Sequence, residues 1–303
     1  MHRIVSARCS APSSGPVRSF PQDNLLHCLG MARQRLGQHF LADAGWREQI
    51  AQAIRVSPQS IGGALAHKAA HDCWIEIGAG HGEMTEQLAA SGAPVVAIEI
   101  DPSLAGQVRK LARGFSALTV IEGDILQMDI AALAAGRRIR IYGNLPYYIT
   151  SPILQHLFQY SEIIDEIDIV IQTEVALRLT AEPRSKSYGY LSVVTQLFAR
   201  PEFVFEIPRG AFRPPPEVGS ALVALRLPSP LRELRQRGGE PLLQFVKVCF
   251  SQKRKTLANN LRVRWTRVQV QGALDVLKLK PEARAEELSV LELAALHQAL
   301  TAA

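Results

Sequence analysis

The stretch that decides the fold runs from residue 73 to residue 82 and reads Cys73-Trp74-Ile75-Glu76-Ile77-Gly78-Ala79-Gly80-His81-Gly82. Its first five residues predict a short buried strand, and the apolar spacing of Met84 and Leu88 predicts a helix directly after it. A strand, a glycine-rich turn and a helix form the setting in which backbone amides approach a bound nucleotide. No Lys-Ser or Lys-Thr pair follows directly after these glycines, which excludes a phosphate-gripping loop. Glycines alone can also serve only the geometry of the turn.

Polar residues follow the next strands at matching positions. The run Val95–Asp101 carries Glu99 roughly twenty residues past the glycines, where such folds place a ribose-binding carboxylate. Two further apolar runs, 118–122 and 138–142, lead into Asp124 and Asn144. Because the carboxyl ends of parallel strands share one edge of a sheet, we expect these side chains and the glycine turn to meet there.

Residues 141–150 read Ile141-Tyr142-Gly143-Asn144-Leu145-Pro146-Tyr147-Tyr148-Ile149-Thr150 and contain no charge. The Asn144 amide offers one acceptor and two donors, and Pro146 fixes the backbone so that neighbouring carbonyls stay in place. Tyr147 adds a face on which a planar ring can stack. The segment suits a flat, neutral, hydrogen-bonding ligand such as a nucleobase amine, although an ordinary proline-containing turn accounts for the segment taken alone.

The composition is that of a soluble globular protein, and its positive net charge is compatible with an anionic partner without identifying one. The 303 residues are 47% hydrophobic and 20% charged, with a net charge of +6. No apolar run reaches the roughly 18 residues of a membrane span, so no membrane partner is expected. The four cysteines are scattered, which supports neither a disulfide framework nor a metal site and suits a reducing, cytoplasmic location.

The chain divides into three parts. Residues 1–30 predict a disordered extension or a misassigned start, with Met31 as the true one. Residues 31–228 carry the alternating strands and helices, including expected strands at 168–172, 203–207 and 221–227 and helices at 46–54, 152–160 and 174–180. Pro228-Ser229-Pro230 predicts a boundary, and residues 229–303 predict helices at 242–251, 253–261, 268–277 and 288–300.

Basic residues concentrate in two segments. Residues 242–274 contain no acid and seven basic residues, among them Lys253, Arg254 and Lys255, and a second group lies at Arg33 and Arg35. Charged runs are usually solvated faces, but one sign over thirty residues is the electrostatic footprint of nucleic-acid binding.

With these residues in view, the sequence resembles the ribosomal RNA adenine N6,N6-dimethyltransferase family, and within it the branch that acts on the bacterial small subunit. The resemblance runs from about Met31 to the C-terminus. It is carried by 35–41 (Arg-Leu-Gly-Gln-His-Phe-Leu), 76–80 (Glu-Ile-Gly-Ala-Gly), 99–101 (Glu-Ile-Asp), 123–124 (Gly-Asp), 144–147 (Asn-Leu-Pro-Tyr), 212–216 (Phe-Arg-Pro-Pro-Pro) and 250–257 (Phe-Ser-Gln-Lys-Arg-Lys-Thr-Leu). The 144–147, 212–216 and 250–257 motifs are specific to this family, whereas the glycine motif indicates only the methyltransferase class.

The resemblance implies an α/β Rossmann-like class I methyltransferase domain with a seven-stranded, mostly parallel sheet and a small all-α C-terminal domain. The cofactor it implies is S-adenosyl-L-methionine, with contacts that carry over onto His39, Leu41, Gly78, Gly80, Glu99, Asp124 and Asn144. Glu99 would take the ribose hydroxyls and Asp124 the adenine amine of the cofactor. Many relatives have Asn at position 39, and either side chain can hydrogen-bond to the methionine end.

The implied reaction is dimethylation of two adjacent adenosines in a small-subunit rRNA hairpin, within a 30S precursor particle, by a monomeric enzyme. Accepting hydrogen bonds from the N6 amine, through the Asn144 oxygen and the Leu145 carbonyl, would favour the pyramidal nitrogen that attacks the methyl group. Pro146 holds this turn, while Tyr147 and Phe212 would stack on the flipped base. Neither a general base nor a metal is expected.

Three alternatives remain open on the sequence. A relative that confers erythromycin resistance would act on large-subunit RNA, but the long basic C-terminal segment favours the small subunit. A DNA adenine methyltransferase is disfavoured because Leu145 precedes a single proline. A binding protein, either a ribosome-assembly checkpoint or a mitochondrial-type transcription factor, would keep the fold without catalysis, and the intact Glu99, Asp124, Asn144 and Tyr147 argue against that loss.

Overall fold

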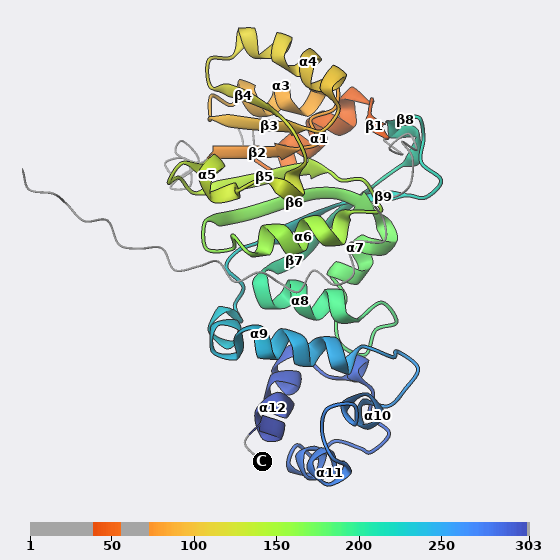
Figure 1. Ribbon diagram of the computed structural model, residues 1–303. Helices are drawn as coiled ribbons and strands as arrows, with labels where there is room; N and C mark the ends of the chain where they lie inside the picture. The colour runs from red at the N-terminus through yellow and green to blue at the C-terminus, as the bar shows by residue number, and fades with distance from the viewer. Residues whose placement is uncertain (1–38, 56–72, 302–303) are drawn as a thin grey trace, which may run out of the picture. The chain divides into compact units, whose positions relative to one another are not determined.

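A seven-stranded sheet forms the centre of the computed structural model, which describes residues 39–55 and 73–301 (Figure 1). The strand order is β4-β3-β2-β5-β6-β9-β7. The strands are β2 (Cys73–Ile77), β3 (Val95–Glu99), β4 (Leu118–Glu122), β5 (Ile139–Asn144), β6 (Ile164–Gln172), β7 (Arg200–Ile207) and β9 (Ser220–Arg226). Strand β9 runs antiparallel to both β6 and β7, and the other pairs are parallel. The predicted fold class is confirmed.

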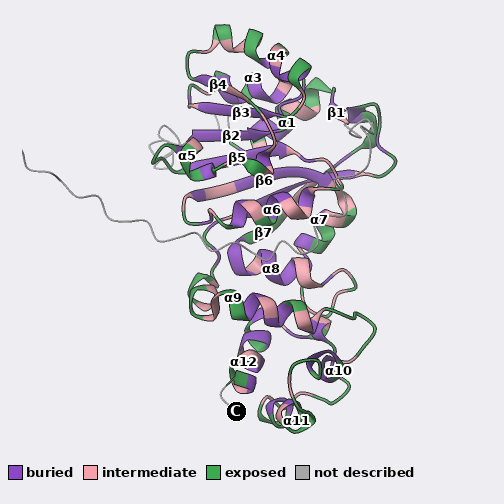
Figure 2. Ribbon diagram, viewed as in Figure 1, coloured by how far each residue is buried: buried purple, intermediate pink, exposed green. Residues whose placement is uncertain are grey.

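Helices cover both faces of the sheet, which explains why the strands are continuous apolar runs. One face packs with α1 (Ala44–Ala53), α3 (Glu83–Ala90) and α4 (Pro102–Leu111), and the other with α5 (Ile130–Ala134), α6 (Thr150–Phe158), α7 (Thr173–Leu179) and α8 (Tyr190–Phe198). Successive residues of β2 show the alternation, since Ile75 joins one buried cluster and Trp74 the other. The central strands are accordingly buried along their length (Figure 2).

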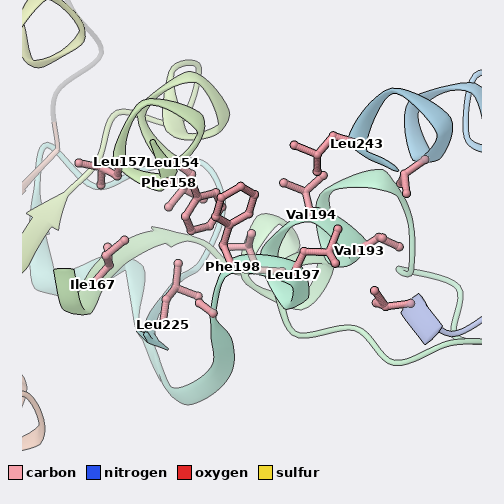
Figure 3. Packing of buried hydrophobic residues seen from close by; sticks show 14 of the residues in the cluster. Leu154, Leu157, Phe158, Ile167, Val193, Val194, Leu197, Phe198, Leu225 and Leu243 are labelled. Carbon is pink, nitrogen blue, oxygen red and sulfur yellow. The ribbon is translucent and has the colours of Figure 1, made fainter. Parts of the chain in front are cut away.

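Four further helices follow the sheet: α9 (Arg232–Cys249), α10 (Leu257–Leu261), α11 (Arg267–Val276) and α12 (Val290–Thr301). Short 3-10 turns lie at 112–114, 125–127, 209–211 and 285–287. The buried cluster continues from α6 through α8 to α9 (Figure 3). In it, the Phe158 and Phe198 rings stack with centroids 4.7 Å apart and planes 6° apart, while Val194 and Leu243 extend the packing toward α9. The boundary expected at residue 228 therefore falls inside one continuous core, and the division into two domains stays a prediction. Within the described ranges, no helix is both long and apolar enough to cross a membrane.

Several elements differ from the sequence expectations for local reasons. Strand β6 begins four residues earlier than expected because the charges of Asp165 and Glu166 are paired with arginines. Strand β7 includes Pro201, which an edge strand tolerates. Helix α10 begins only after the N-cap Thr256, so the basic residues expected in a helix lie in the turn before it. Helix α8 was not predicted.

Two very short strands complete the frame around the site. β1 (Phe40–Leu41) pairs antiparallel with β8 (Phe212–Arg213), with Leu41 opposite Phe212. This pairing brings the N-terminal motif onto the loop that contains Pro214, Pro215 and Pro216. The motifs around residues 40 and 212, far apart in the sequence, therefore lie side by side at one side of the site.

Candidate active site

The strand order reverses between β2 and β5, the place where open α/β sheets bind ligands. A pocket that is open to solvent, with about 450 Å³ of empty space, lies there. Its lining contains eight of the predicted site residues together with Phe40, which sequence reasoning did not single out. The lining residues are His39, Phe40, Gly78, Gly80, Glu99, Asn144, Leu145, Pro146 and Tyr147.

The glycine turn is required by geometry as well as by space. Gly78 and Gly80 have φ values of +73° and +58°, a region that favours glycine. A Cβ at Gly80 would lie 3.1 Å from Cδ1 of Phe40. The Phe40 ring therefore lies directly on the turn, and a side chain at Gly80 would push it away.

Glu99 is held rigidly at the end of β3. It is only 1% exposed, and its Oε2 accepts a hydrogen bond from the Gly80 amide at 2.8 Å while Oε1 accepts one from the Asp101 amide at 2.9 Å. A carboxylate has about four lone-pair positions, so acceptor capacity is left for ligand hydroxyls. The predicted ribose contact of Glu99 fits this geometry.

Asn144 is oriented by the main chain of the N-terminal motif. Its Nδ2 donates to the His39 carbonyl at 2.9 Å. Because a carbonyl oxygen can only accept, this contact fixes which end of the amide faces His39 and leaves Oδ1 on the other side as a free acceptor. The residue before it must be small, since a Cβ at Gly143 would lie 2.7 Å from Cδ2 of Leu145.

Tyr147 forms the aromatic side of the pocket. Its hydroxyl shares a 2.9 Å hydrogen bond with Oγ of Ser220, and burial raises the pKa of Tyr147, so the phenol stays neutral. The ring lies nearly parallel to that of His39, with centroids 5.8 Å apart and planes 25° apart. Nδ1 of His39 in turn lies 2.8 Å from the Pro214 carbonyl.

A second cavity of about 330 Å³ adjoins the first and shares Phe40, Gly78, Gly80 and Asn144 with it. It is lined by Glu76 and Tyr142, two groups that sequence reasoning did not select. Thr85 Oγ1 donates to Glu76 at 2.5 Å, and burial raises the pKa of Glu76 to about 8. The Tyr142 hydroxyl has no hydrogen-bond partner among the described residues. The sequence signal that could have identified them is a polar group, the acid Glu76 or the phenol Tyr142, within a buried strand.

Asp124 and Phe212 lie outside the linings of both cavities, and Leu41 lines only the second one. Asp124 is half-buried, and its Oδ1 accepts the Leu126 amide at 3.0 Å at the start of a 3-10 turn. Leu41 is 5% exposed and Phe212 is fully buried, opposite each other in the β1–β8 pair. Their roles toward cofactor and base stay predictions, and for Phe212 the stacking role requires its ring to leave the core.

Only some of the predicted RNA-binding residues lie in the part of the chain that the structure describes. Lys253, Arg254 and Lys255 are exposed in the turn between α9 and α10, and Lys253 Nζ donates to the Lys186 carbonyl at 3.0 Å. Arg33 and Arg35 lie outside the described residues. Among the residues that the structure describes, no group of His, Cys, Asp and Glu side chains could hold a metal ion.

Comparison with known proteins agrees with this geometry. A family model described as "Ribosomal RNA adenine dimethylase" matches residues 30–302. A protein of Acidobacterium capsulatum described as "Ribosomal RNA small subunit methyltransferase A" is 40% identical over 275 residues, which cover 89% of this chain and 92% of the relative.

Two solved structures share the fold. The 23S rRNA methyltransferase ErmE is 26% identical with a TM-score of 0.64, over 86% of this chain and 99% of its own. A dimethyladenosine transferase from Plasmodium falciparum is 24% identical with a TM-score of 0.67, over 85% and 96%. The expectation drawn from the sequence motifs is confirmed: this chain belongs to the ribosomal RNA adenine dimethylase family.

Proposed function

We propose that this chain transfers methyl groups to the N6 amines of two adjacent adenosines in a small-subunit (16S) rRNA hairpin and thereby produces N6,N6-dimethyladenosine. The observation that carries the proposal is the orientation of Asn144. Its amide is fixed by the His39 carbonyl, with Oδ1 free in a pocket that also contains the glycine turn, Glu99 and Tyr147. A neutral acceptor beside an aromatic face suits an exocyclic amine on a planar base.

The residues present fit S-adenosyl-L-methionine as the cofactor. When bound, the cofactor supplies a methyl group on a sulfonium, which is already a strong electrophile. Glu99, with spare acceptor positions at the end of β3, would hold the ribose hydroxyls, as in other folds of this kind. Glu76 and the Tyr142 hydroxyl, which has no hydrogen-bond partner among the described residues, line the adjoining cavity and would hydrogen-bond with the amino-acid end of the cofactor.

The chain contributes mainly by position. Asn144 Oδ1 and the Leu145 carbonyl would accept the two N6 hydrogens, which draws the nitrogen lone pair out of conjugation with the ring and toward the methyl group. Attack by this nitrogen would form the nitrogen–carbon bond as the methyl group leaves the sulfonium with its electron pair on sulfur, and the nitrogen would then lose its extra proton to water. Alignment of this kind contributes several kcal/mol to lowering a barrier. A slot that admits one methyl group on nitrogen allows a second transfer.

The partners follow from the charge of the chain and the family. We propose binding to small-subunit RNA within a 30S precursor in the cytoplasm, by a monomer, with a role in small-subunit biogenesis. The exposed cations at Lys253, Arg254 and Lys255 support an RNA contact. Relatives that act on RNA of either ribosomal subunit share the fold, so the choice of subunit rests on the 40% identical relative and the basic segment.

The direct test is methyl transfer with labelled S-adenosylmethionine to purified small and large ribosomal subunits that lack the modification. Nuclease digestion and mass spectrometry identify the modified nucleoside. Dimethyladenosine in small-subunit RNA alone is the expected result. Modification of large-subunit RNA would overturn the substrate, and tight subunit binding without transfer would identify a binding factor.

A second test concerns the basic turn. Replacing Lys253, Arg254 and Lys255 with Gln should weaken subunit binding and reduce the log–log salt dependence by up to about 0.7–0.9 units per lost phosphate contact. The matched control is Arg109→Gln, which changes a cation that is already paired with Glu122. If the salt dependence of subunit binding is unchanged in the triple variant, these three residues are ordinary solvated surface charges.

A further inference from the structure

The basic turn, which runs from Gln252 to Lys255, connects α9 to α10 (Figure 1). The Gln252 carbonyl accepts a hydrogen bond from the Lys255 amide at 3.0 Å, so Lys253 and Arg254 occupy the two central positions of the turn. All three basic side chains are exposed. Because adjacent like charges repel one another, this compact conformation needs support from another part of the chain.

Asn260 of α10 supplies this support. Its side chain is only 3% exposed, and its Nδ2 donates to the Cys249 carbonyl at 2.7 Å and to the Gln252 carbonyl at 3.3 Å. The first of these carbonyls lies in the last turn of α9, where the helix itself offers no amide partner. The second is the carbonyl that closes the basic turn. One buried amide therefore ties the basic turn to the end of α9.

Helix α10 is itself fixed by the core. Leu257 and Leu261 are fully buried, and the Leu257 amide donates to the Ala283 carbonyl at 2.8 Å. The turn thus rests on a helix that cannot shift without loss of packing. Its charges stay available, since Lys253 Nζ donates one hydrogen to the Lys186 carbonyl and its ammonium group has two others.

We propose that Asn260 is a positioning residue for RNA binding, which holds the basic turn in the conformation that presents Lys253, Arg254 and Lys255 together to phosphate groups. The inference rests on the proposed function and names the residue that preorganises its RNA contact. Ordering a flexible segment costs free energy when a ligand binds, and a segment that is already held avoids this cost. Asn260 is buried and acts through the turn without touching the RNA.

The test is a double-mutant cycle on the full chain. Asn260→Ala is made in the wild type and in the variant in which Lys253, Arg254 and Lys255 are replaced with Gln. Fluorescence anisotropy of the labelled chain gives the Kd for purified small ribosomal subunits that lack the modification, and it needs no methyl transfer. Calorimetry with S-adenosylhomocysteine verifies folding. The matched control is Val270→Ala, which removes buried atoms from α11.

Asn260→Ala should weaken subunit binding by about tenfold in the wild type, because three long side chains then have to be ordered on binding. In the Gln variant it should change the Kd by less than about twofold, since a turn without cations has nothing to position. Val270→Ala should bind like the wild type.

Limited digestion with trypsin, which cleaves after Lys and Arg, gives a second readout. Cleavage at 253–255 should be about tenfold faster in Asn260→Ala than in Val270→Ala, because the released turn opens locally. If Asn260→Ala does not bind S-adenosylhomocysteine, Asn260→Leu, which fills the site without offering a donor, takes its place in the cycle.

An equal loss of affinity in both backgrounds would overturn the inference, and so would an unchanged Kd or a digestion pattern like that of Val270→Ala. If the Gln variant binds like the wild type, the basic turn makes no RNA contact and the inference fails with it. A coupled loss of binding in a protein that methylates neither subunit would refute the proposed reaction and leave the role of Asn260 in place.

Discussion

Toward the carboxyl ends of β2 and β5, Glu76 and Tyr142 are buried without an ion pair among the described residues, whereas at the opposite ends of β5 and β6 Glu166 is paired with two arginines. Arg140 Nη2 lies 2.8 Å from Glu166 and also donates to the Ile54 carbonyl at 2.6 Å. Its guanidinium lies over the Trp74 ring at 4.2 Å. The same sheet therefore pairs its carboxylates with arginines at one edge, whereas at the other it buries an acid and a phenol that have no cation beside them among the described residues.

The difference separates stability from function. Carboxylates that are paired with arginines, such as Glu166, hold neighbouring strands together and have no ligand role in this site. Unpaired ones destabilise the empty protein and are retained where a ligand completes them. Between the two edges, Asp168 lies opposite Tyr142 in the sheet and 3.7 Å from Arg140, and burial raises its pKa.

The largest expected effect comes from removing Arg140, which pairs with the carboxylates of Glu166 and Asp168. Arg140→Ala leaves buried Glu166 and Asp168 with less compensation, so we expect the free energy of unfolding to fall by about 3–5 kcal/mol. Urea denaturation measures it. S-adenosylhomocysteine affinity of the folded fraction should be unchanged, and a selective loss of ligand binding without loss of stability would contradict the division between the two edges.

Asn144→Ala tests the ligand-binding edge of the sheet, at the carboxyl ends of β2 and β5. It removes the oriented acceptor, and we expect methyl transfer to fall by about a hundredfold to a thousandfold, as for the loss of one preorganised polar group in other enzymes. RNA binding and the unfolding midpoint should persist, because the residue is only half-buried at the pocket. Loss of binding and folding together would make Asn144 a structural residue.

Glu76→Gln gives a pH-dependent effect. The pKa of Glu76 is raised to about 8, so between its unfolded value of 4.5 and about 8 the folded protein holds a proton that the unfolded chain has released. Stability from this group therefore falls as pH rises through that window, by up to about 1.4 kcal/mol per pH unit.

The Glu76→Gln variant should lack that slope in unfolding experiments between pH 5 and 8. Glu48→Gln, on the exposed side of α1, is the matched control and should keep it. If wild type and Glu76→Gln show the same pH dependence, the unpaired acid does not destabilise the empty protein.

The smallest effect is expected at the surface. Arg109 and Glu122 form an ion pair at 3.0 Å, with side chains 47% and 40% exposed. Arg109→Ala should change the free energy of unfolding by less than about 1 kcal/mol. A loss as large as that of Arg140→Ala would mean that burial does not determine how much an ion pair contributes to the free energy of unfolding.

The parts of this molecule that the sequence predicted are those set by local patterns. The runs at 73–77, 95–101 and 138–142, with their glycines, acids and Asn144, placed the strands and the ligand-binding edge. A helix was expected to begin at Leu242, directly after Pro241. In the structure α9 begins at Arg232 and continues across a break at Gly239. The spacing of apolar residues in the sequence does not show this earlier part of the helix.

The rest depends on contacts between distant segments. A two-residue strand such as β1 carries no period, and its partner lies about 170 residues away, so the pairing of Leu41 with Phe212 and the burial of that ring could not be foreseen. The same holds for the contact between Asn144 and His39. Glu76 was visible as an acid within an apolar strand, but only packing shows that it has no cation beside it.

The β1–β8 pair has a consequence for a chain still being synthesised. A nascent chain that has emerged only as far as β7 carries the glycine turn, Glu99 and Asn144, but it has neither the strand that holds Leu41 nor the Pro214 carbonyl that receives His39. The pocket wall can close only after residue 214 has been added. Binding competence therefore arrives late in translation, and incomplete chains would not compete with the finished protein for its ligands.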